Sequence, residues 1–312
     1  MRAFAVRSFG QAPAAQDLPI PSAEGQFLIR VKFAGVNPID YKLVDRLTAT
    51  SKYPFVLGAD FAGAVESAPP GQSDFRAGDR IFGEARTHGA YAQYTAVAPG
   101  ARPEPLAKIP DGVSDEQAAA LPIAATTALG SLNLLGVSAG QTLVVMGAAG
   151  GVGGFAVQIA RSRGAHVIAT VRGGADEALR LGAEEAYDIQ AGDVIDALHA
   201  AHPDGVDAVL DLVNGPKSIC RDAEILKPQG SLVSSIGAAD EAWFAARKIT
   251  AHNIGGNNNT SMSPQGLGEV VRMLADGKIT ARIRSTVALE GATQIIEKVR
   301  SGGLSGKAVI RL

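Results

Sequence analysis

The chain has 312 residues, with 29 lysines and arginines against 31 aspartates and glutamates and a formal net charge of -2. Neither sign of charge forms a run, so the sequence carries no footprint for nucleic acid or anionic lipid, and small molecules are the expected partners. The one cysteine, Cys220, excludes an intrachain disulfide and a cysteine-based zinc site and indicates a reducing, cytoplasmic compartment. Residues 1–21 lack a signal-peptide core, and no stretch reaches the ~20 apolar residues of a membrane span.

The first third of the chain is typical of β structure. Since 312 residues are many for a single core, two domains are expected. Apolar and polar residues alternate, as in half-buried antiparallel strands, over residues 1–9, 27–33, 56–66, 80–82 and 91–97. A small barrel would bury these faces without exposed edges. Ser114 and Gln117 then form a capping box ahead of an alanine-rich helical segment that runs to residue 132, and the domain boundary is expected within it.

Residues 142–171 predict a strand, a tight turn, a helix and a second strand. An apolar run at 142–146 is followed by small residues and then by Phe155 and Ile159 at helical spacing. Arg163 and Gly164 are typical of a helix end, and residues 166–171 are typical of a buried strand. The unit is therefore β-α-β, with a crossover that is expected to be right-handed.

The turn of this unit fits the pattern G-x-G-x-x-G with alanine in the first place, and it consists of Ala148, Ala149, Gly150, Gly151, Val152 and Gly153. Gly150 would let the backbone approach a pyrophosphate, and Gly153 would let the helix lie close to its strand. The free N–H groups of the first helical turn would face the anion. A glycine-rich turn that serves only packing is the alternative, but the flanking strand and helix favour a dinucleotide.

The end of the second strand indicates which dinucleotide is bound. Units that bind NAD place a carboxylate there, on the ribose 2′-hydroxyl. Residues 168–172 contain none and include Thr170 and Arg172 instead. The Arg172 guanidinium could meet a 2′-phosphate with paired hydrogen bonds, which favours NADPH, while a solvated surface arginine is the alternative.

The alternation of helices and strands continues beyond this unit. Helices are expected at 176–181, 193–200 and 218–226, and strands at 186–189, 208–213, 231–236 and 249–254. With the strands at 142–146 and 166–171, this pattern predicts an α/β fold with a doubly wound six-stranded parallel sheet. Ligands bind at the carboxyl ends of such strands, so the end of the fifth strand, Ser235, Ile236 and Gly237, is expected to border the cofactor.

The last fifty residues are expected to return to the N-terminal domain, as helix, helix and strand over 264–277, 292–301 and 307–312. The predicted domains are therefore residues 1–121 with 263–312, and residues 122–262.

Several short pieces, in order and spacing, resemble the medium-chain dehydrogenase/reductase superfamily, specifically its zinc-free quinone oxidoreductase branch (ζ-crystallin-like). They are residues 34–40 (AGVNPID), 58–63 (GADFAG), 78–81 (GDRI), 89–92 (GAYA), 126–128 (TTA), 148–153 (AAGGVG) and 306–307 (GK). The resemblance covers nearly the whole chain. It implies a GroES-like, mainly β domain built from both chain ends and a central Rossmann domain.

The resemblance also concerns metal. In the zinc alcohol dehydrogenases of the superfamily, a metal-binding cysteine stands at the position of Asn37 and a histidine at that of Ala59. Both ligands are missing here, so no metal is expected and zinc-type alcohol oxidation is disfavoured. The connection at residues 172–176 looks shorter than the family's usual one and lacks its frequent lysine, which leaves Arg172 with more of the phosphate load.

By the same resemblance, Asn37, Asp40, Tyr41 and Lys42 lie at a strand end that faces the nicotinamide. Asn37 could hydrogen-bond the substrate oxygen or the nicotinamide ribose, Tyr41 could orient or protonate the substrate, and Asp40 would support them. A turn asparagine ahead of proline and a packing tyrosine are the alternatives.

Two further residues are assigned through the resemblance. Thr127 resembles a threonine that approaches the nicotinamide in relatives, although a structural threonine near a helix start is an even alternative. Lys307, in the matching Gly306-Lys307 pair, is counted among the cofactor-binding residues.

The implied activity is zinc-independent, NADPH-dependent reduction of quinones or other electron-poor conjugated carbonyl compounds. A 2-alkenal or enoyl reductase that acts on an activated C=C bond is the alternative, and a low-turnover, crystallin-like NADPH-binding protein is another. A homodimer is expected as well, as in relatives, through an edge strand at residues 249–254.

Overall fold

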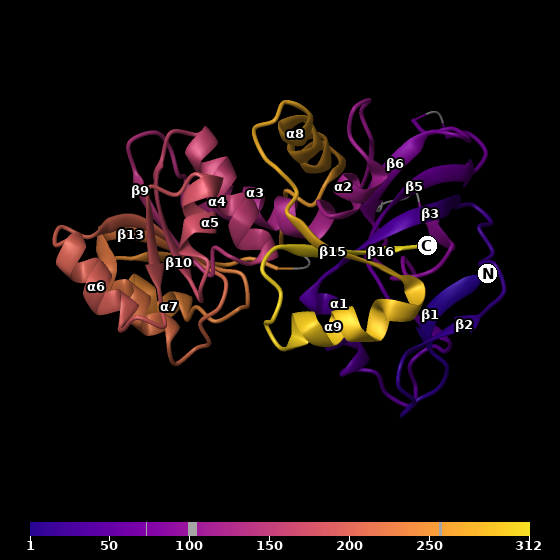
Figure 1. Cartoon of the computed structure of the whole chain (residues 1–312), viewed down its shortest axis with the longest axis horizontal. Helices are drawn as coiled ribbons and strands as arrows, with labels where there is room; N and C mark the ends of the chain where they lie inside the picture. The colour runs from indigo at the N-terminus through magenta and orange to yellow at the C-terminus, as the bar shows by residue number, and fades with distance from the viewer. Residues whose placement is uncertain (73, 99–104, 256–257) are drawn as a thin grey trace. The chain divides into compact units, whose positions relative to one another are not determined.

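The computed structural model describes residues 1–72, 74–98, 105–255 and 258–312. The chain divides into two compact units, and the first consists of Met1–Ala124, Met262–Asp276 and Ala281–Leu312. The second consists of Ala125–Ser261 and Gly277–Thr280. Both chain ends, indigo and yellow in Figure 1, belong to the first unit. The domain boundaries expected after residues 121 and 262 stay a prediction.

The strands of the first unit are β1 (Arg2–Val6), β2 (Ala14–Asp17), β3 (Phe27–Val36), β4 (Phe55–Val56), β5 (Asp60–Ser67), β6 (Arg80–Glu84), β7 (Tyr94–Val97), β8 (Leu106–Lys108), β15 (Ile283–Ala288) and β16 (Lys307–Arg311). They form a seven-stranded sheet of order β15-β16-β3-β5-β6-β8, with β7 paired to β3, and a three-stranded sheet of order β2-β1-β4. The expectation of one small barrel was wrong, because the strands form two separate sheets. The ten-residue strand β3 pairs with β7 through its first half and with β16 through its second half.

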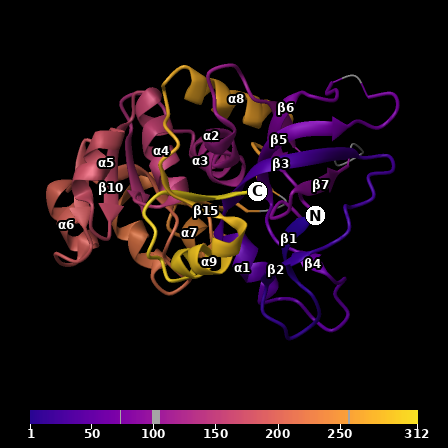
Figure 2. The ribbon, with the colours of Figure 1, turned by 45° about the vertical axis from the view of Figure 1, so that its right-hand side comes forward.

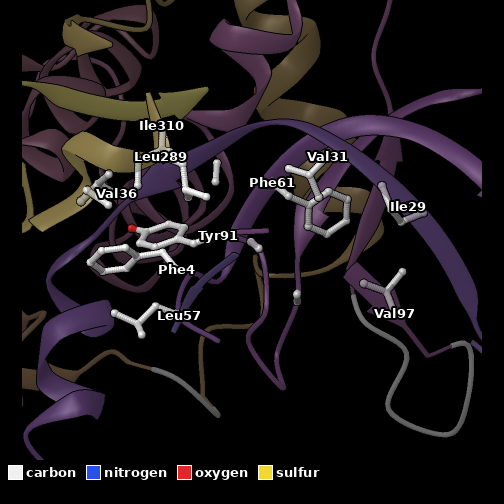
Figure 3. Close-up of a cluster of buried hydrophobic side chains, with 14 of the residues drawn as sticks. Phe4, Ile29, Val31, Val36, Leu57, Phe61, Tyr91, Val97, Leu289 and Ile310 are labelled. Atoms are coloured by element: carbon white, nitrogen blue, oxygen red, sulfur yellow. The ribbon is translucent and has the colours of Figure 1, made fainter. Parts of the chain in front are cut away.

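Alternation along these strands produces the core of the first unit. In β3 the side chains of Phe27, Ile29 and Val31 are buried, while Arg30 and Lys32 between and beyond them are exposed. Figure 3 shows the inward side chains from several strands in one cluster. Each such fully buried side chain stabilises the fold by about 1.5–3 kcal/mol.

The return of the C-terminal segment to the N-terminal domain is confirmed, because β16 pairs antiparallel with β3. Its helices are α8 (Pro264–Ala275), which precedes β15, and α9 (Ala292–Arg300), which the short 3-10 helix η2 (Leu289–Gly291) joins to β15. The sequence reading passed over β15, whose residues are alternately half-buried and exposed and therefore give a weak apolar signal.

Two expectations for secondary structure between residues 37 and 135 need correction. The single helix expected from residue 114 is two helices, α2 (Asp115–Ala119) and α3 (Pro122–Leu135), because Pro122 begins a new helix. The capping box is confirmed, since Gln117 N–H donates to Ser114 Oγ and Ser114 N–H to Gln117 Oε1, both at 3.1 Å. The residues after Asn37 are not a strand end but the helix α1 (Pro38–Val44).

The second unit confirms the doubly wound six-stranded parallel sheet. Its strands are β9 (Thr142–Met146), β10 (His166–Val171), β11 (Glu185–Asp188), β12 (Val206–Asp211), β13 (Leu226–Ser234) and β14 (Thr250–Asn253), in the order β11-β10-β9-β12-β13-β14. The helices that follow β9 are α4 (Gly151–Ser162), α5 (Ala175–Leu181), α6 (Val194–Ala201) and α7 (Glu241–Ala245), and Figure 2 shows α4 and α5 beside β10. The segment expected as a helix at 218–226 is a 3-10 helix, η1 (Ile219–Ile225).

None of the helices in the four described ranges has the length and apolar character needed to cross a membrane.

Candidate active site

The turn between β9 and α4 is built around Gly147. This residue has φ +87°, and its N–H and that of Ala148 donate to Thr170 O at 3.2 and 3.0 Å. Thr170 Oγ1 accepts from Gly147 N–H at 3.3 Å, so this threonine holds the turn to the neighbouring strand. The sequence reading began the motif at Ala148 and missed Gly147, although a glycine directly after a buried strand is the signal for a left-handed turn.

The motif glycines differ in the space around them. A Cβ on Gly153 would lie 2.7 Å from Ala148 Cα, so only glycine lets α4 pack this closely on the turn. A Cβ on Gly150 would meet its nearest heavy atom, Gly147 O, at 3.4 Å, an ordinary separation. Gly150 caps α4, and the N–H groups of Gly151, Val152 and Gly153 form its first turn. The turn thus fits a pyrophosphate, which needs space beside Gly150 and these donors.

Arg172 is exposed directly after β10, and its side chain makes no hydrogen bond or ion pair with residues of the described ranges. A carboxylate that the sequence reading missed lies close to the same strand end. Asp188 ends β11 opposite Val171 and accepts from Gly173 N–H at 3.1 Å and from Gln190 N–H at 3.0 Å. The guanidinium is therefore available to an anion, while the carboxylate is engaged by the backbone.

At the carboxyl ends of β12 and β13, two large apolar side chains are exposed, Val213 by 58% and Ile236 by 45%. Ser235 is half-buried, and Gly237 has φ +74°. Val213 lies against the turn between β9 and α4, because a Cβ on Gly147 would approach its Cγ1 to 2.6 Å. The sequence reading had Ser235, Ile236 and Gly237 but not Val213, an apolar residue beyond the strand.

In the first unit, Asn37, Asp40, Asp60, Tyr91 and Lys307 form a buried polar group that we call the Lys307 cluster. None of the five is more than 4% exposed. Asn37 follows β3 in extended conformation (φ -136°) and caps α1, and its N–H donates to Asp40 Oδ2 at 2.8 Å. Tyr91 Oη donates to the same oxygen at 2.7 Å. Figure 3 shows the Tyr91 ring beside Phe4 and Leu57 in the apolar core.

The side chain of Asn37 joins two charged groups of this cluster. Lys307 Nζ donates to Asn37 Oδ1 at 2.6 Å and to Val36 O at 2.8 Å. Asn37 Nδ2 donates to Asp60 Oδ2 at 2.8 Å. Ile123 N–H, in the first turn of α3, donates to both Asp60 oxygens at 3.2 Å. Lys307, assigned to the cofactor from the sequence, thus lies within the first unit and is bonded to Asn37.

Burial changes the proton affinities in the Lys307 cluster. It raises the pKa of Asp40 to about 6 and also acts to raise that of Asp60, while the charge of Lys307 pulls both down. Burial also lowers the pKa of Lys307, against the attraction of the two carboxylates. The pKa of Tyr91 is raised well above its usual value by burial and by Asp40. The cluster is thus a site where two carboxylates share one cation.

Tyr41 and Thr127 lie apart from the hydrogen bonds of this cluster. The Tyr41 ring is half-buried beneath Arg300, whose guanidinium carbon lies 4.7 Å from the ring centroid. Arg300 also makes paired hydrogen bonds to Asp45 at 3.0 and 3.1 Å. Thr127 is half-buried in α3, in the second unit. The tyrosine that bonds Asp40 is Tyr91. It and Asp60 lie in family-like segments that the sequence reading quoted, but neither was assigned to the site.

No three His, Cys, Asp or Glu side chains in the described part of the chain gather as metal ligands. Ala59 is buried, with 1% exposure, where a histidine ligand would otherwise stand. The absence of zinc stays a prediction from the residue types.

Family models match both halves of the chain. The model described as alcohol dehydrogenase GroES-like domain matches residues 23–111, and the one described as zinc-binding dehydrogenase matches residues 151–276. The quinone oxidoreductase of Rattus norvegicus is 30% identical over 330 residues, which cover 100% of this chain and 98% of the rat protein. This chain belongs to the quinone oxidoreductases of the medium-chain dehydrogenase/reductase superfamily. It is therefore an oxidoreductase.

Other similar proteins extend the comparison. A trans-enoyl reductase of Aspergillus japonicus is 30% identical over 242 residues, 68% of this chain and 69% of that protein. Among solved structures, the quinone oxidoreductase of Coxiella burnetii has a TM-score of 0.88 at 28% identity, covering 100% of this chain and 99% of that one. A mycobacterial protein solved with NADPH has a TM-score of 0.86 at 26% identity, covering 100% of both chains.

Proposed function

We propose that this quinone oxidoreductase family member reduces quinones, or other electron-poor conjugated carbonyl compounds, with NADPH and without zinc. The observation that carries the proposal is the residue pair Asn37 and Ala59, a buried amide and a methyl group at the two positions of zinc ligands. Without a Lewis acid, a substrate must already spread the arriving charge onto oxygen, as a quinone does. Elemental analysis of the purified protein is expected to find no stoichiometric zinc, and one zinc per chain would contradict the proposal.

When bound, NADPH supplies the hydride. The residues proposed to hold it are the N–H groups of Gly151, Val152 and Gly153, Arg172 at the 2′-phosphate, and the strand end Ser235, Ile236 and Gly237 with Ala148 and Ala149. Asn37 donates a hydrogen bond to the substrate oxygen, and Tyr41 orients the substrate. With a quinone, the oxygen that gains charge takes its proton from solvent, so no single obligatory acid is needed.

The substrate class is tested by NADPH oxidation with 1,4-benzoquinone, 9,10-phenanthrenequinone and an enone. Quinone turnover well above enone turnover is the expected result. Because one similar protein is a trans-enoyl reductase, the second candidate is reduction of an activated C=C bond. Faster turnover with the enone would favour it. Binding of NADPH without turnover of any acceptor would indicate the low-turnover, crystallin-like protein.

The proposed binding of the pyrophosphate by the turn at residues 148–153 is tested by Gly150→Ala. The added methyl group has room in the protein itself, so the thermal unfolding midpoint of the cofactor-free protein is expected to stay within about 2 °C. The methyl group would occupy space needed by the pyrophosphate, so the Kd for NADPH is expected to rise at least about tenfold. Gly268→Ala, in α8 with its nearest neighbour at 3.8 Å, is the control. An unchanged Kd for Gly150→Ala would count against a pyrophosphate here.

Preference for NADPH is assigned to Arg172. Arg172→Ala removes charge-assisted hydrogen bonds worth about 1.5–3 kcal/mol, so NADPH binding should weaken by roughly one to two orders of magnitude while NADH binding stays nearly unchanged. Arg180→Ala, an exposed arginine on α5 paired with Glu177, is the matched control. Equal losses for both cofactors would mean that Arg172 acts structurally.

A cytoplasmic homodimer completes the proposal. Strand β14 is an end of the six-stranded sheet in the described chain, and a second copy could pair with it across a twofold axis. Light scattering at micromolar concentration is expected to give twice the chain mass. A monomer would contradict the dimer.

A further inference from the structure

We propose that Lys307 and Asp60 are positioning residues that fix the Asn37 amide as a hydrogen-bond donor toward the substrate. The site would then recognise an oxygen that accepts a hydrogen bond, such as a carbonyl or the enolate or phenolate oxygen that forms from it. This inference rests on the proposed function, because it names the feature of the substrate that Asn37 recognises.

The orientation of the amide follows from its two neighbours. Oδ1 lies 2.6 Å from the Lys307 ammonium, and Nδ2 lies 2.8 Å from the Asp60 carboxylate. A rotation of the amide by half a turn would place the NH₂ group against the ammonium and the carbonyl oxygen against the carboxylate. Two charge-assisted hydrogen bonds would become two repulsive contacts. The amide therefore has one stable orientation.

The two neighbours are themselves held in place. Asp60 accepts from Ile123 N–H with both oxygens at 3.2 Å, and the positive end of the α3 dipole stabilises its charge. Lys307 begins β16, is 4% exposed, and also donates to Val36 O at 2.8 Å. Neither side chain can follow a reorientation of Asn37 without losing buried hydrogen bonds.

Only a donor remains on Asn37 for a ligand. Its carbonyl oxygen accepts from Lys307, and one Nδ2 hydrogen goes to Asp60, so the other Nδ2 hydrogen has no partner among the residues that the structure describes. Hydrogen bonds in a chain polarise one another, so Lys307 on the carbonyl side strengthens this donor. A donor aimed at an oxygen that gains negative charge stabilises the transition state, whereas a hydroxyl group that donates to Asn37 would have to share its oxygen with the Lys307 ammonium.

This arrangement assigns Lys307 a role other than contact with the cofactor. Two of its three ammonium hydrogens are used by Val36 O and Asn37 Oδ1 inside the first unit. A residue that positions Asn37 should affect turnover and leave NADPH affinity unchanged. A residue that contacts the cofactor should do the reverse.

The test compares kcat with 9,10-phenanthrenequinone and the Kd for NADPH in four variants. Asn37→Asp removes the donor and should lower kcat by about 10²–10³, as loss of one oxyanion donor does. Lys307→Gln removes the charge but keeps an amide donor, and kcat should fall by at least about tenfold. Asp60→Asn keeps an oxygen for Asn37 and should lower kcat less than Lys307→Gln. The exposed Lys298→Gln, on α9, should change nothing. All four should bind NADPH within about twofold of the wild type.

Two results would overturn the inference in an active enzyme. One is unchanged kcat in Asn37→Asp, and the other is Lys307→Gln with a tenfold weaker Kd for NADPH and normal kcat. A wild type that turns over no acceptor would instead contradict the proposed function.

The orientation of Asn37 can also be tested without turnover. NMR of the Asn37 side-chain NH₂ group, identified by its loss in Asn37→Asp, should show slow hydrogen exchange in the wild type and faster exchange in Lys307→Gln. Equal exchange rates in the two proteins would overturn the inference, and they would do so even in a protein without activity.

Discussion

Each unit buries two aspartates, and the two units neutralise them differently. In the first unit, Asp40 and Asp60 share the Lys307 ammonium. In the second, Asp211 and Asp222 are 0% and 1% exposed, and no lysine hydrogen bond reaches them within the described residues. Burial first, then the hydrogen bond and charge of Asp211, raise the pKa of Asp222 to about 9. One pair is balanced by a cation and the other by a retained proton.

The Asp211–Asp222 pair holds a turn at the end of β12. Asp211 Oδ1 accepts from Val213 N–H at 2.7 Å and from Asn214 N–H at 2.8 Å, which shapes the segment that lies against Gly147 in the turn between β9 and α4. Asp211 Oδ2 is buried and has no nitrogen donor in the described chain, so a proton on Asp222 is its partner. The comparison teaches that a buried cation offsets the charge of the carboxylates beside the Asn37 amide, whereas in the second pair a shared proton joins two carboxyl groups that hold the backbone of Val213 and Asn214 and the Asn214 amide.

The largest expected effect is on the cation. Lys307→Met leaves Asp60 and Asn37 Oδ1 without their partner, and breaking a buried pair in this way costs about 3–5 kcal/mol of the free energy of unfolding. Urea unfolding at pH 7 measures the loss. Adding Asp60→Asn to this variant should recover part of the stability, because one of the two carboxyl groups that lost their cation is then neutral. A double variant as unstable as Lys307→Met would show that the charge balance is not what Lys307 contributes.

The next effect concerns the proton and depends on pH. The pKa of Asp222 is raised from 3.8 to about 9. Between these values the folded state binds more protons than the unfolded state, so wild-type stability falls as pH rises, by at most about 1.4 kcal/mol per pH unit. Asp222→Asn keeps a neutral donor and lacks this slope. Its stability relative to the wild type should therefore rise by up to about 3 kcal/mol between pH 6 and pH 8.

Urea unfolding at pH 6, 7 and 8 checks this prediction, with the exposed Asp204→Asn as control. Parallel curves for the wild type and Asp222→Asn would mean that Asp222 is ionised in the folded protein, and the contrast with the Lys307 cluster would disappear.

The fold was largely predictable because its signals are local. The β9-turn-α4-β10 unit follows from a short apolar run, a glycine-rich turn and helical spacing within one window of the chain. Strand β15 escaped because none of its residues is fully buried, and α1 escaped because Pro38 after Asn37 also suits a simple turn. The apolar periodicity of the sequence does not predict such elements, because contacts with distant parts of the chain determine their secondary structure.

The site was predictable only in part, because its partners are far apart in sequence. Asn37 was identified, but Asp60 and Lys307, which hold its amide, lie 23 and 270 positions away. Lys307 was recognised as part of a family-like pair and assigned to the cofactor. Its burial and its hydrogen bond to Asn37 are explained without a contact to the cofactor. Asp222 gave no signal at all, because a carboxyl group that keeps its proton cannot be told from an ionised one in a sequence.

The smallest expected effect comes from Glu185, a partly exposed carboxylate of the second unit. Glu185 accepts or shares hydrogen bonds with His166 at 2.8 Å, Tyr187 at 2.9 Å and His202 at 3.1 Å. Partial burial acts to raise its pKa, but the bonds from these three residues outweigh it and leave the pKa below the ordinary 4.5. Its side chain is 30% exposed, so water and salt screen the pairs.

Glu185→Gln is therefore expected to cost less than about 1 kcal/mol at pH 7, despite the number of hydrogen bonds. The sign of its pH dependence is opposite to that of Asp222. A lowered pKa contributes stability above the unfolded value, and this contribution is lost as pH falls through the folded value, so the gap between wild type and variant should close in acid. Urea unfolding at pH 7 and in acid checks both points. A cost of several kcal/mol would show that the number of hydrogen bonds, and not the exposure of the carboxylate, decides how much each of these carboxyl groups contributes to stability.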